Sequence, residues 1–255
     1  MTTVATRDAE VLELRARLKA GTWRQVVILT GAGISVASGL PTYRGPGGLW
    51  TRPGAEVPDA ELFARDPSRL WSLFGPMRGD VRAAVPNAAH LALAAWEAQL
   101  PEGGSFTLLT QNVDGLHARA GSRNVVELHG SLLRTRCSNP DCTLSPFEDL
   151  AGHEHAPACG GCGQPLRPDV TLFGETLPVD AEWAAKKALR ECDLFLSIGT
   201  SGTVAPAANF VRGAKYAGAW TLLVNLTPMQ PRHPDFDVEV LGPAERLLPL
   251  LLGSA

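Results

Sequence analysis

Five short, mostly apolar runs restrict this chain to one class of fold. They are residues 26–29, 106–110, 125–128, 194–198 and 220–224. Segments with helical spacing of apolar residues lie around and between them, at 11–19, 88–99, 181–190, 205–216 and 243–252. Such short runs are typical of parallel strands that are buried on both faces, and strands alternating with helices favour an α/β fold. We therefore expect a parallel sheet with helices on both faces.

Two segments interrupt this alternation and are expected to form a second, smaller domain. Residues 46–86 are rich in proline and contain Trp50 and Trp71 as expected anchors, so we expect a mostly helical insert. Residues 131–168 contain four cysteines and too few apolar residues for a core of their own, which predicts a module that needs a cross-link. The sheet domain would then comprise 1–45, 87–130 and 169–255.

Charge and hydropathy exclude several partners. With 23 Lys and Arg against 26 Asp and Glu, the net charge of −3 does not favour nucleic acid or an anionic membrane. The longest apolar runs are shorter than the ~20 residues of a membrane span. Residues 1–10 contain Arg7, Asp8 and Glu10 and no apolar stretch, so we expect no secretory signal and a cytoplasmic location. The oligomeric state is not indicated.

The four clustered cysteines have the spacing of a metal site. Cys137 and Cys142 form one pair and Cys159 and Cys162 a second, with 16 residues between the pairs. Two such pairs can place four thiolates around one tetrahedral zinc ion, which would be structural because no coordination position stays open. His153 or His155 in the intervening loop is the alternative for one ligand. Cys192, which precedes an apolar strand, is expected to be a buried thiol.

Polar residues directly follow each expected strand. They are Gly31-Ala32-Gly33, Gln111-Asn112-Val113-Asp114, His129-Gly130, Gly199-Thr200-Ser201 and Asn225. Because open α/β sheets bind ligands beyond the carboxyl ends of their strands, the set predicts a binding crevice there. Structural interpretations stay open for single residues. Asn112 and Asp114 are also suitable helix caps, Asn225 suits a turn, and His129 could be a hydrogen-bonded histidine at a strand end.

The first glycine turn alone is a weak signal. Gly31 and Gly33 would let a pyrophosphate approach the backbone, but an ordinary strand-to-helix turn has the same pattern. A full dinucleotide fingerprint needs a third glycine where Val36 stands, which speaks against a standard dehydrogenase.

Several blocks taken together resemble the sirtuins, a family of NAD-dependent protein deacylases. The blocks cover most of residues 26–245 in the family's order. They are 31–44 (GAGISVASGLPTYR), 110–117 (TQNVDGLH), 127–130 (ELHG), the four cysteines, 167–175 (RPDVTLFGE) and 199–201 (GTS). The resemblance implies a Rossmann-like sheet with a small zinc-and-helix domain, and NAD and an acyl-lysine peptide that meet between them.

The resemblance also implies a role for each matching residue. His129 would be the general base, and Asn112 and Asp114 would position the ribose and the nicotinamide. NAD would be bound by Gly31, Ala32, Gly33, Ser35, Tyr43, Arg44, Gln111, Asn112, Asp114, Gly199, Thr200, Ser201, Asn225 and Ala244. The acyl-lysine substrate would lie against Phe74, Met77, Val170, Phe173, Gly174 and Glu175. Four-cysteine zinc would complete the set of cofactors.

The implied reaction is deacylation of lysine. His129 would accept a proton from a ribose hydroxyl, the acyl oxygen would displace nicotinamide, and free lysine and O-acyl-ADP-ribose would result. Two alternatives stay open: mono-ADP-ribosyl transfer to a protein side chain at the same NAD site, and a non-catalytic NAD-sensing or zinc-ribbon interaction module. The presence of a side chain that can take a proton at 129 favours deacylation.

Three positions depart from the family's pattern. Tyr43 stands where the family usually has Phe, and the first cysteine pair has four intervening residues rather than two. Residues 66–71 (DPSRLW) resemble the branch that removes dicarboxylic acyl groups and binds the acyl carboxylate with a Tyr-x-x-Arg pair, whose positions are here Phe74 and Met77. We therefore expect succinyl to be disfavoured, unless the adjacent Arg78 compensates. In the alternative, Phe74 and Met77 are only core residues of the insert.

Overall fold

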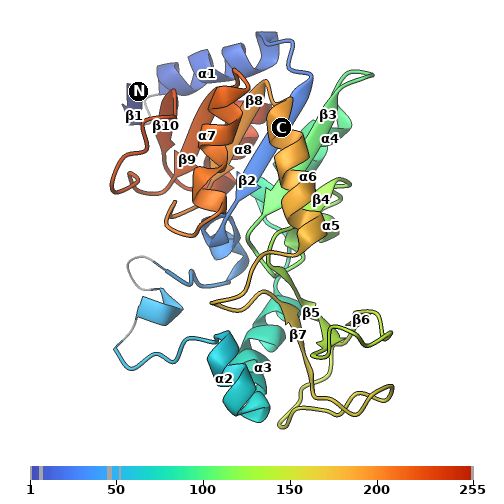
Figure 1. Ribbon diagram of the computed structural model, residues 1–255. Coiled ribbons are helices and arrows are strands. Elements are labelled where there is room, and N and C mark those ends of the chain that lie inside the picture. The colour runs from blue at the N-terminus through green and yellow to red at the C-terminus, as the bar shows by residue number, and fades with distance from the viewer. Residues whose placement is uncertain (1, 6–7, 45–47, 52, 254–255) are drawn as a thin grey trace.

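The large lobe of the molecule is built on a seven-stranded parallel sheet. A computed structural model describes residues 2–5, 8–44, 48–51 and 53–253 (Figure 1). The strand order is β1-β10-β9-β8-β2-β3-β4, and every pairing is parallel. The bounds are Thr2–Ala5 for β1, Gln25–Thr30 for β2, Ser105–Thr110 for β3, Val125–Glu127 for β4, Leu194–Ile198 for β8, Trp220–Asn225 for β9 and Val238–Leu241 for β10. All five apolar runs are strands, which confirms the expected fold class.

Helices cover both faces of this sheet because alternate residues of its strands are apolar on both sides. In β2, Val26 and Ile28 pack in one core and Val27 and Leu29 in a second core. The first core contains α1 (Asp8–Ala20), α4 (Ala88–Ala98) and α8 (Ala244–Leu252), and the second contains α6 (Val179–Arg190) and α7 (Phe210–Tyr216). Strands buried on both faces need apolar residues at every position, which is the pattern in the sequence.

The smaller lobe combines the two interrupting segments (Figure 1). A three-stranded antiparallel sheet has the order β6-β5-β7, with β5 at Gly130–Cys137, β6 at Phe147–Glu148 and β7 at Leu166–Val170. Helices α2 (Ala60–Arg65) and α3 (Pro67–Ala83) pack beside it. Trp71 of α3 is fully buried, and its Nε1 donates to the carbonyl of Leu166 at 2.9 Å. The tryptophan therefore anchors the helical insert to the cysteine-containing segment.

Local sequence signals explain where these helices begin. The side chain of Asp59 accepts a hydrogen bond from the N–H of Leu62, and that of Asp66 accepts one from Arg69, so each aspartate caps a helix. Pro67 occupies the first turn of α3, where its missing N–H costs nothing. The remaining short elements are the 3₁₀ segments η1 (Ala32–Ser38), η2 (Leu49–Thr51) and η3 (Ala207–Asn209) and the helix α5 (Leu116–Arg119).

The large sheet contains two neighbouring strands, β1 at its edge and β10 beside it, that the sequence pattern does not indicate. In β10 the apolar run is interrupted by Glu239, which is fully buried and accepts a hydrogen bond from the N–H of Met229 at 3.1 Å. The expected limits of the cysteine module, 131 and 168, fall inside β5 and β7, and the division into domains stays a prediction. Of the expected helical insert, residues 46, 47 and 52 lie outside the described residues. Within the part of the chain that the structure describes, no helix combines the length and apolar content needed to cross a bilayer.

Candidate functional site

The site lies at β2, the strand of the large sheet from which the strand order continues to β3 on one side and to β8 on the other. β2 is followed along the chain by β3 on one side of it, whereas β8 pairs with its other side. Beyond the carboxyl ends of β2 and β8, the N–H of Gly33 donates to the carbonyl of Gly199 at 2.9 Å. A Cβ at Gly33 would stand 2.7 Å from the Cα of Gly199, and Gly199 has a φ of +62°. Glycine is therefore required at both positions for the two loops to cross this closely.

A cavity of about 1370 Å³ opens at this crossing and is lined by both lobes. Its volume exceeds the range of roughly 300–1,000 Å³ that is usual for one small ligand. Of the residues that the sequence assigns to cofactor, catalysis or substrate, all but Ser35 and Asp114 line it. Those that do are Gly31, Ala32, Gly33, Tyr43, Arg44, Phe74, Met77, Gln111, Asn112, His129, Val170, Phe173, Gly174, Glu175, Gly199, Thr200, Ser201, Asn225 and Ala244.

His129 has the geometry of a base with one free nitrogen. Its Nδ1 lies 2.9 Å from the main-chain carbonyl of Gln111. Because a carbonyl only accepts, Nδ1 carries the proton and Nε2 keeps its lone pair. The half-buried ring has a pKa below its ordinary value, since burial disfavours the cation more than the bond to Gln111 favours it. The imidazole is therefore neutral near pH 7.

Ser35 and Asp114 form a buried layer behind Asn112. The amide nitrogen of Asn112 donates to the carbonyl of Gly31 at 3.1 Å and to the hydroxyl of Ser35 at 3.2 Å. Ser35 in turn donates to Asp114 Oδ2 at 2.7 Å, while Asp114 Oδ1 accepts from the N–H of Leu116 at 2.9 Å. Burial raises the pKa of Asp114 in spite of these bonds. The N-cap of α5 is Gly115 rather than Asp114, so the helix-cap interpretation of Asp114 is wrong; its carboxylate bonds to the N–H of Leu116 and also orients Ser35 and, through it, Asn112.

Two buried histidines extend this layer and were not indicated by the sequence. His117 Nε2 lies 2.9 Å from the hydroxyl of Thr30, and His90 Nε2 lies 3.5 Å from that of Ser35. The two imidazole rings have centroids 4.8 Å apart. Burial lowers the pKa of both, to about 4 for His90. His90 stands alone in α4, and His117 in α5 is only the last residue of the block 110–117. Neither position indicates a role by itself, and only the fold brings the two rings together.

On the other side of the crossing, Asn225 joins the ends of two strands. Its Oδ1 accepts from the N–H of Thr200 at 3.0 Å, and its Nδ2 donates to the carbonyl of Thr200 at 2.9 Å. Asn225 therefore has a structural role here in addition to its place in the cavity. Sequence reasoning missed the further lining segments at 203–206, 226–230 and 242–245, apart from Ala244. The Gly242-Pro243 pair after β10 is the one turn signal that could have indicated the last of them.

Aromatic rings connect the glycine turn to the small lobe. The ring of Trp50 stacks on that of Tyr43 with centroids 4.5 Å apart, and it meets the ring of Phe173 edge-on at 5.0 Å. The guanidinium carbon of Arg44 lies 4.8 Å from the centre of the Phe173 ring. Burial and the nearby charge of Asp114 raise the pKa of Tyr43, so its hydroxyl stays protonated. Trp50, which the sequence suggests as an anchor, is thus part of the cavity.

Phe74 and Met77 are core residues of the insert that also face the cavity, and their contact with an acyl group stays a prediction. They line the cavity, and they also pack in the hydrophobic cluster of the small lobe together with Val170. The segment after β7 is held by Glu175, whose carboxylate accepts from Arg167 Nη1 at 2.5 Å and from the N–H of Leu172 at 2.8 Å. These bonds outweigh burial and hold the pKa of Glu175 below its ordinary value.

The four clustered cysteines form a site that fits zinc. Their Sγ atoms all lie within 4.8 Å of one another, and all the cysteines are free of disulfides. The distances are 3.4 Å between Cys137 and Cys162 and 3.7 Å between Cys142 and Cys159. A tetrahedral ion with Zn–S bonds of about 2.3 Å needs sulfurs about 3.8 Å apart. The N–H groups of Asn139 and Gly161 each lie 3.4 Å from a cysteine sulfur, as expected for thiolates.

The alternative ligand and the fifth cysteine have other partners. His153 Nε2 is bonded to Asp149 Oδ2 at 2.8 Å, and its ring packs edge-on against Trp71. Neither His153 nor His155 belongs to the metal-binding group that the described residues form. The Cys192 thiol is buried and donates to the carbonyl of Leu194 at 3.2 Å, as expected for a structural residue.

Comparison with known proteins agrees with this geometry. Residues 31–206, more than half of the chain, match the model of the Sir2 family. An NAD-dependent protein deacylase 2 of Pyrobaculum aerophilum is 46% identical over 230 residues, which is 90% of each chain. A crystal structure of a Sir2 homolog–NAD complex superposes with a TM-score of 0.85 at 36% identity, covering 100% of this chain and 96% of the other. A Sir2 variant with deacetylated p53 peptide and 3′-O-acetyl-ADP-ribose superposes with a TM-score of 0.81 at 29% identity, over 98% and 99% of the two chains. With its glycine crossing, its histidine and its four-cysteine cluster in one architecture, the chain belongs to the Sir2 family.

Proposed function

We propose that this chain is an NAD-dependent protein-lysine deacylase that releases nicotinamide and O-acyl-ADP-ribose. The observation that carries the proposal is the His129 imidazole, whose Nε2 is free in a cavity lined by the glycine crossing on one side and an apolar wall on the other. The Pyrobaculum relative is named as an NAD-dependent protein deacylase, and the p53-peptide structure contains two of the three products. The acyl group passes from lysine to ADP-ribose, nicotinamide leaves and one water molecule is consumed, so the reaction is a group transfer.

The residues of the large lobe suit NAD. Polar side chains of Gln111, Asn112 and Ser201 line the cavity at the carboxyl ends of parallel strands, where such sheets bind nucleotides. When bound there, NAD supplies a ribose whose bond to nicotinamide can be broken. Asn112 is oriented by Ser35 and the carbonyl of Gly31, so it presents a fixed amide to the ribose and nicotinamide.

His129 takes the proton of the reaction. Its Nε2 accepts the proton of a ribose hydroxyl as the acyl oxygen reacts, and the carbonyl of Gln111 keeps the ring in the required tautomer. Burial keeps the pKa of the ring below its ordinary value, so the base form predominates at neutral pH. Asp114 acts through Ser35 and Asn112 as a positioning residue, because it does not line the cavity.

The small lobe provides the substrate side. An acyl-lysine peptide would lie along the segment from Val170 to Glu175, which Arg167 holds in place through Glu175 and the carbonyl of Val170. Four thiolates would hold one zinc ion with no open position, so the metal supports the lobe and takes no part in the chemistry. The sulfur cluster does not line the cavity.

The activity is tested by incubating the protein with NAD and an acetyl-lysine peptide and measuring all products by mass. We expect deacetylated peptide, nicotinamide and O-acetyl-ADP-ribose in equal amounts. Protein carrying ADP-ribose without deacetylated peptide would favour mono-ADP-ribosyl transfer at the same site. An absence of NAD consumption with any acyl peptide would contradict the proposal and favour a non-catalytic NAD-binding module.

A further inference from the structure

One wall of the cavity is apolar and continuous. It is formed by Phe74 and Met77 of α3, Val113 after β3, and Val170 and Leu172 at and after the end of β7. All five residues line the cavity, and all five pack in the same hydrophobic cluster of the small lobe. We call this set the acyl wall, because it lies on the substrate side of the proposed site.

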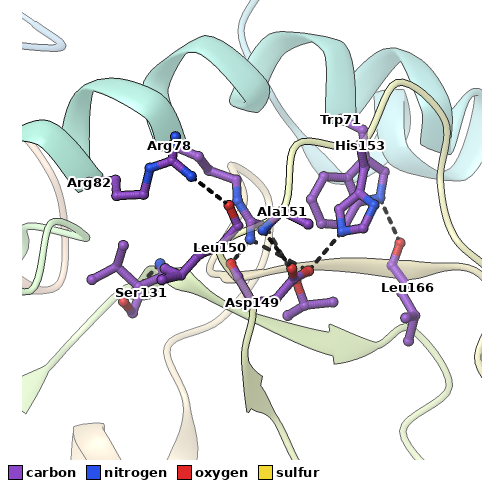
Figure 2. Close-up of polar contacts among 11 residues, drawn as sticks. Trp71, Arg78, Arg82, Ser131, Asp149, Leu150, Ala151, His153 and Leu166 are labelled. Carbon is purple, nitrogen blue, oxygen red and sulfur yellow. Dashed lines mark hydrogen bonds and ion pairs between the residues drawn. The ribbon is translucent and has the colours of Figure 1, made fainter.

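The arginine that adjoins this wall in the sequence is turned away from it. Arg78 follows Met77 but is buried on another side of α3, and it is not a lining residue. Its Nη1 donates to the hydroxyl of Thr135 at 3.2 Å, and its Nη2 donates to the carbonyl of Asp149 and lies 3.5 Å from Asp149 Oδ2 (Figure 2). Arg78 sits in a helix rather than a loop, so it cannot reach the wall without breaking this network.

A second arginine near the wall is neutralised. Arg167 is buried and makes two bonds to Glu175, at 2.5 and 3.0 Å, and one to the carbonyl of Val170 at 2.9 Å. Glu175 lines the cavity, whereas Arg167 does not. The charge that this ion pair presents to the cavity is therefore that of a carboxylate, which repels another carboxylate.

Among the described lining residues, Arg44 is the one Arg or Lys side chain. Its guanidinium carbon lies 4.8 Å from the centre of the Phe173 ring. Its described contact is thus with a lining residue that is not one of the five of the acyl wall. An acyl chain packed on Phe74 and Met77 thus has methyl, methylene, thioether and aromatic groups around its end and no cation.

From this arrangement we infer that the acyl wall selects neutral aliphatic acyl groups and rejects dicarboxylic ones such as succinyl. The inference rests on the proposed deacylase function and specifies its substrate class. A terminal carboxylate on the wall would be buried without a partner or would have to take up a proton, and both are unfavourable. A terminal methyl group at the same place only gains apolar contact.

Butyryl-lysine and succinyl-lysine provide a matched test. Both acyl groups have four carbons and differ in ending with a methyl group or a carboxylate. On one peptide sequence with saturating NAD, we expect kcat/KM to be at least about 100-fold higher for butyryl. Succinamoyl-lysine, which has the shape of succinyl without its charge, should lie between the two and so separate charge from shape.

Two variants test whether the wall itself is responsible. Met77→Arg places a cation among the lining residues and should lower the butyryl-to-succinyl ratio at least tenfold, whereas Met77→Leu, of similar size and apolar, adds no partner for the carboxylate and should keep the ratio above ten. If Met77→Arg does not fold, as judged by its melting temperature, Phe74→Tyr offers a hydroxyl to the carboxylate at the neighbouring position and should lower the ratio in the same direction.

The outcomes separate this inference from the proposed function. A wild-type ratio above ten, together with a lower ratio in a folded variant with the added polar group, supports the inference. A wild-type ratio of ten or less, or a folded Met77→Arg or Phe74→Tyr variant that leaves the ratio unchanged, overturns it while deacylation stands. Failure to process acetyl, butyryl and succinyl peptides alike contradicts the proposed function itself.

Discussion

Three histidines show how much the surroundings of a residue decide its chemistry. Burial lowers the pKa of His90, His117 and His129 alike. His90 and His117 lie inside the large lobe with hydroxyl groups as neighbours and are fully buried. Only His129 of the three lines the cavity, and a main-chain carbonyl fixes its tautomer. A neutral ring with a free nitrogen and access to substrate is what a general base requires.

The first prediction concerns the loss of this base. His129→Ala should lower kcat at least about 100-fold, the lower end of what general-base catalysis contributes, and leave ADP-ribose binding measurable by calorimetry. His155→Ala, which removes an exposed histidine outside the cavity, is the control and should retain activity. A His129→Ala variant with more than a tenth of the wild-type kcat would rule out the assigned role.

The pH dependence of the wild type follows from the same residue. Protonation of His129 removes the base, so kcat/KM should fall as the pH falls through the pKa of the imidazole. Because burial holds that pKa below its ordinary value, the midpoint of this acid limb should lie below about 6.5. The residual activity of His129→Ala should lack this acid limb. If the limb of the wild type is centred above about 6.5, the surroundings stabilise the imidazolium cation and the assigned pKa shift is wrong.

At the scale of elements, a buried polar network joins α3 to the loop after β6. Asp149 accepts from the hydroxyl of Thr135 at 2.7 Å and is bonded to His153 Nε2 at 2.8 Å (Figure 2). Arg78 and Arg82 of α3 donate to the carbonyls of Asp149 and Leu150 in the same loop. The network connects the helical insert to the cysteine-containing segment, two parts of the chain with few apolar residues of their own.

The second prediction concerns this network. Asp149→Ala leaves the buried Arg78 without its counterion and should lower the free energy of unfolding by about 3–5 kcal/mol in denaturant titrations. Burial tends to raise the pKa of Asp149, but its hydrogen bonds and Arg78 outweigh this and hold the pKa below its ordinary value. The stabilisation should therefore be present above about pH 4 and be lost as the pH falls further.

An exposed ion pair of the same lobe provides the comparison. Arg69 and Glu56 lie 2.8 Å apart with side chains 51% and 35% exposed. Glu56→Ala should cost less than about 1 kcal/mol because water screens the pair. Equal effects of the two substitutions would show that Asp149 is not an essential partner of Arg78.

For the whole molecule, the central property is that the two lobes line different sides of one cavity. In the proposed function, the carboxyl ends of the large sheet bind NAD on the polar side of the cavity, and the small lobe provides the acyl wall and the segment for the peptide. Among the described residues, the cluster that holds the small lobe has ten buried apolar residues, and two of these, Leu40 and Leu116, come from the large lobe, which has two extensive cores of its own. The small lobe has the cysteine site in addition. Damage to the metal site should therefore affect one side of the cavity more than the other.

The third prediction tests this division. Metal analysis should find about one zinc per chain, and Cys159→Ala should lose it and destabilise the small lobe, because the free energy of zinc binding is also folding free energy. Deacylation should be lost while ADP-ribose binding is retained in part. Cys192→Ala, in the large lobe, should keep the metal. A fully folded and fully active protein without zinc would disprove the assignment.

Features set by neighbouring residues could be predicted from the sequence. The strands at 26–29 and 194–198, the cysteine cluster and the glycine turn at 31–33 all follow from local patterns, because strand burial, ligand spacing and backbone freedom act over a few residues. The match of many such blocks in one order was enough to indicate the Sir2 family and its NAD-dependent chemistry. The strand β10 was missed because its buried Glu239 breaks the apolar pattern on which the prediction depends.

Only the tertiary structure decided which of the candidate residues meet. Ser35 and Asp114 lie behind the cavity rather than in it, because the hydrogen bond between them joins segments 79 residues apart. Arg78 adjoins Met77 in the sequence but is directed at Asp149, which lies 71 residues further along the chain. Successive residues of a helix point in directions about 100° apart. The sequence therefore determined that the cation of Arg78 lies next to Met77 along the chain, whereas only the fold determined that its side chain points away from the acyl wall.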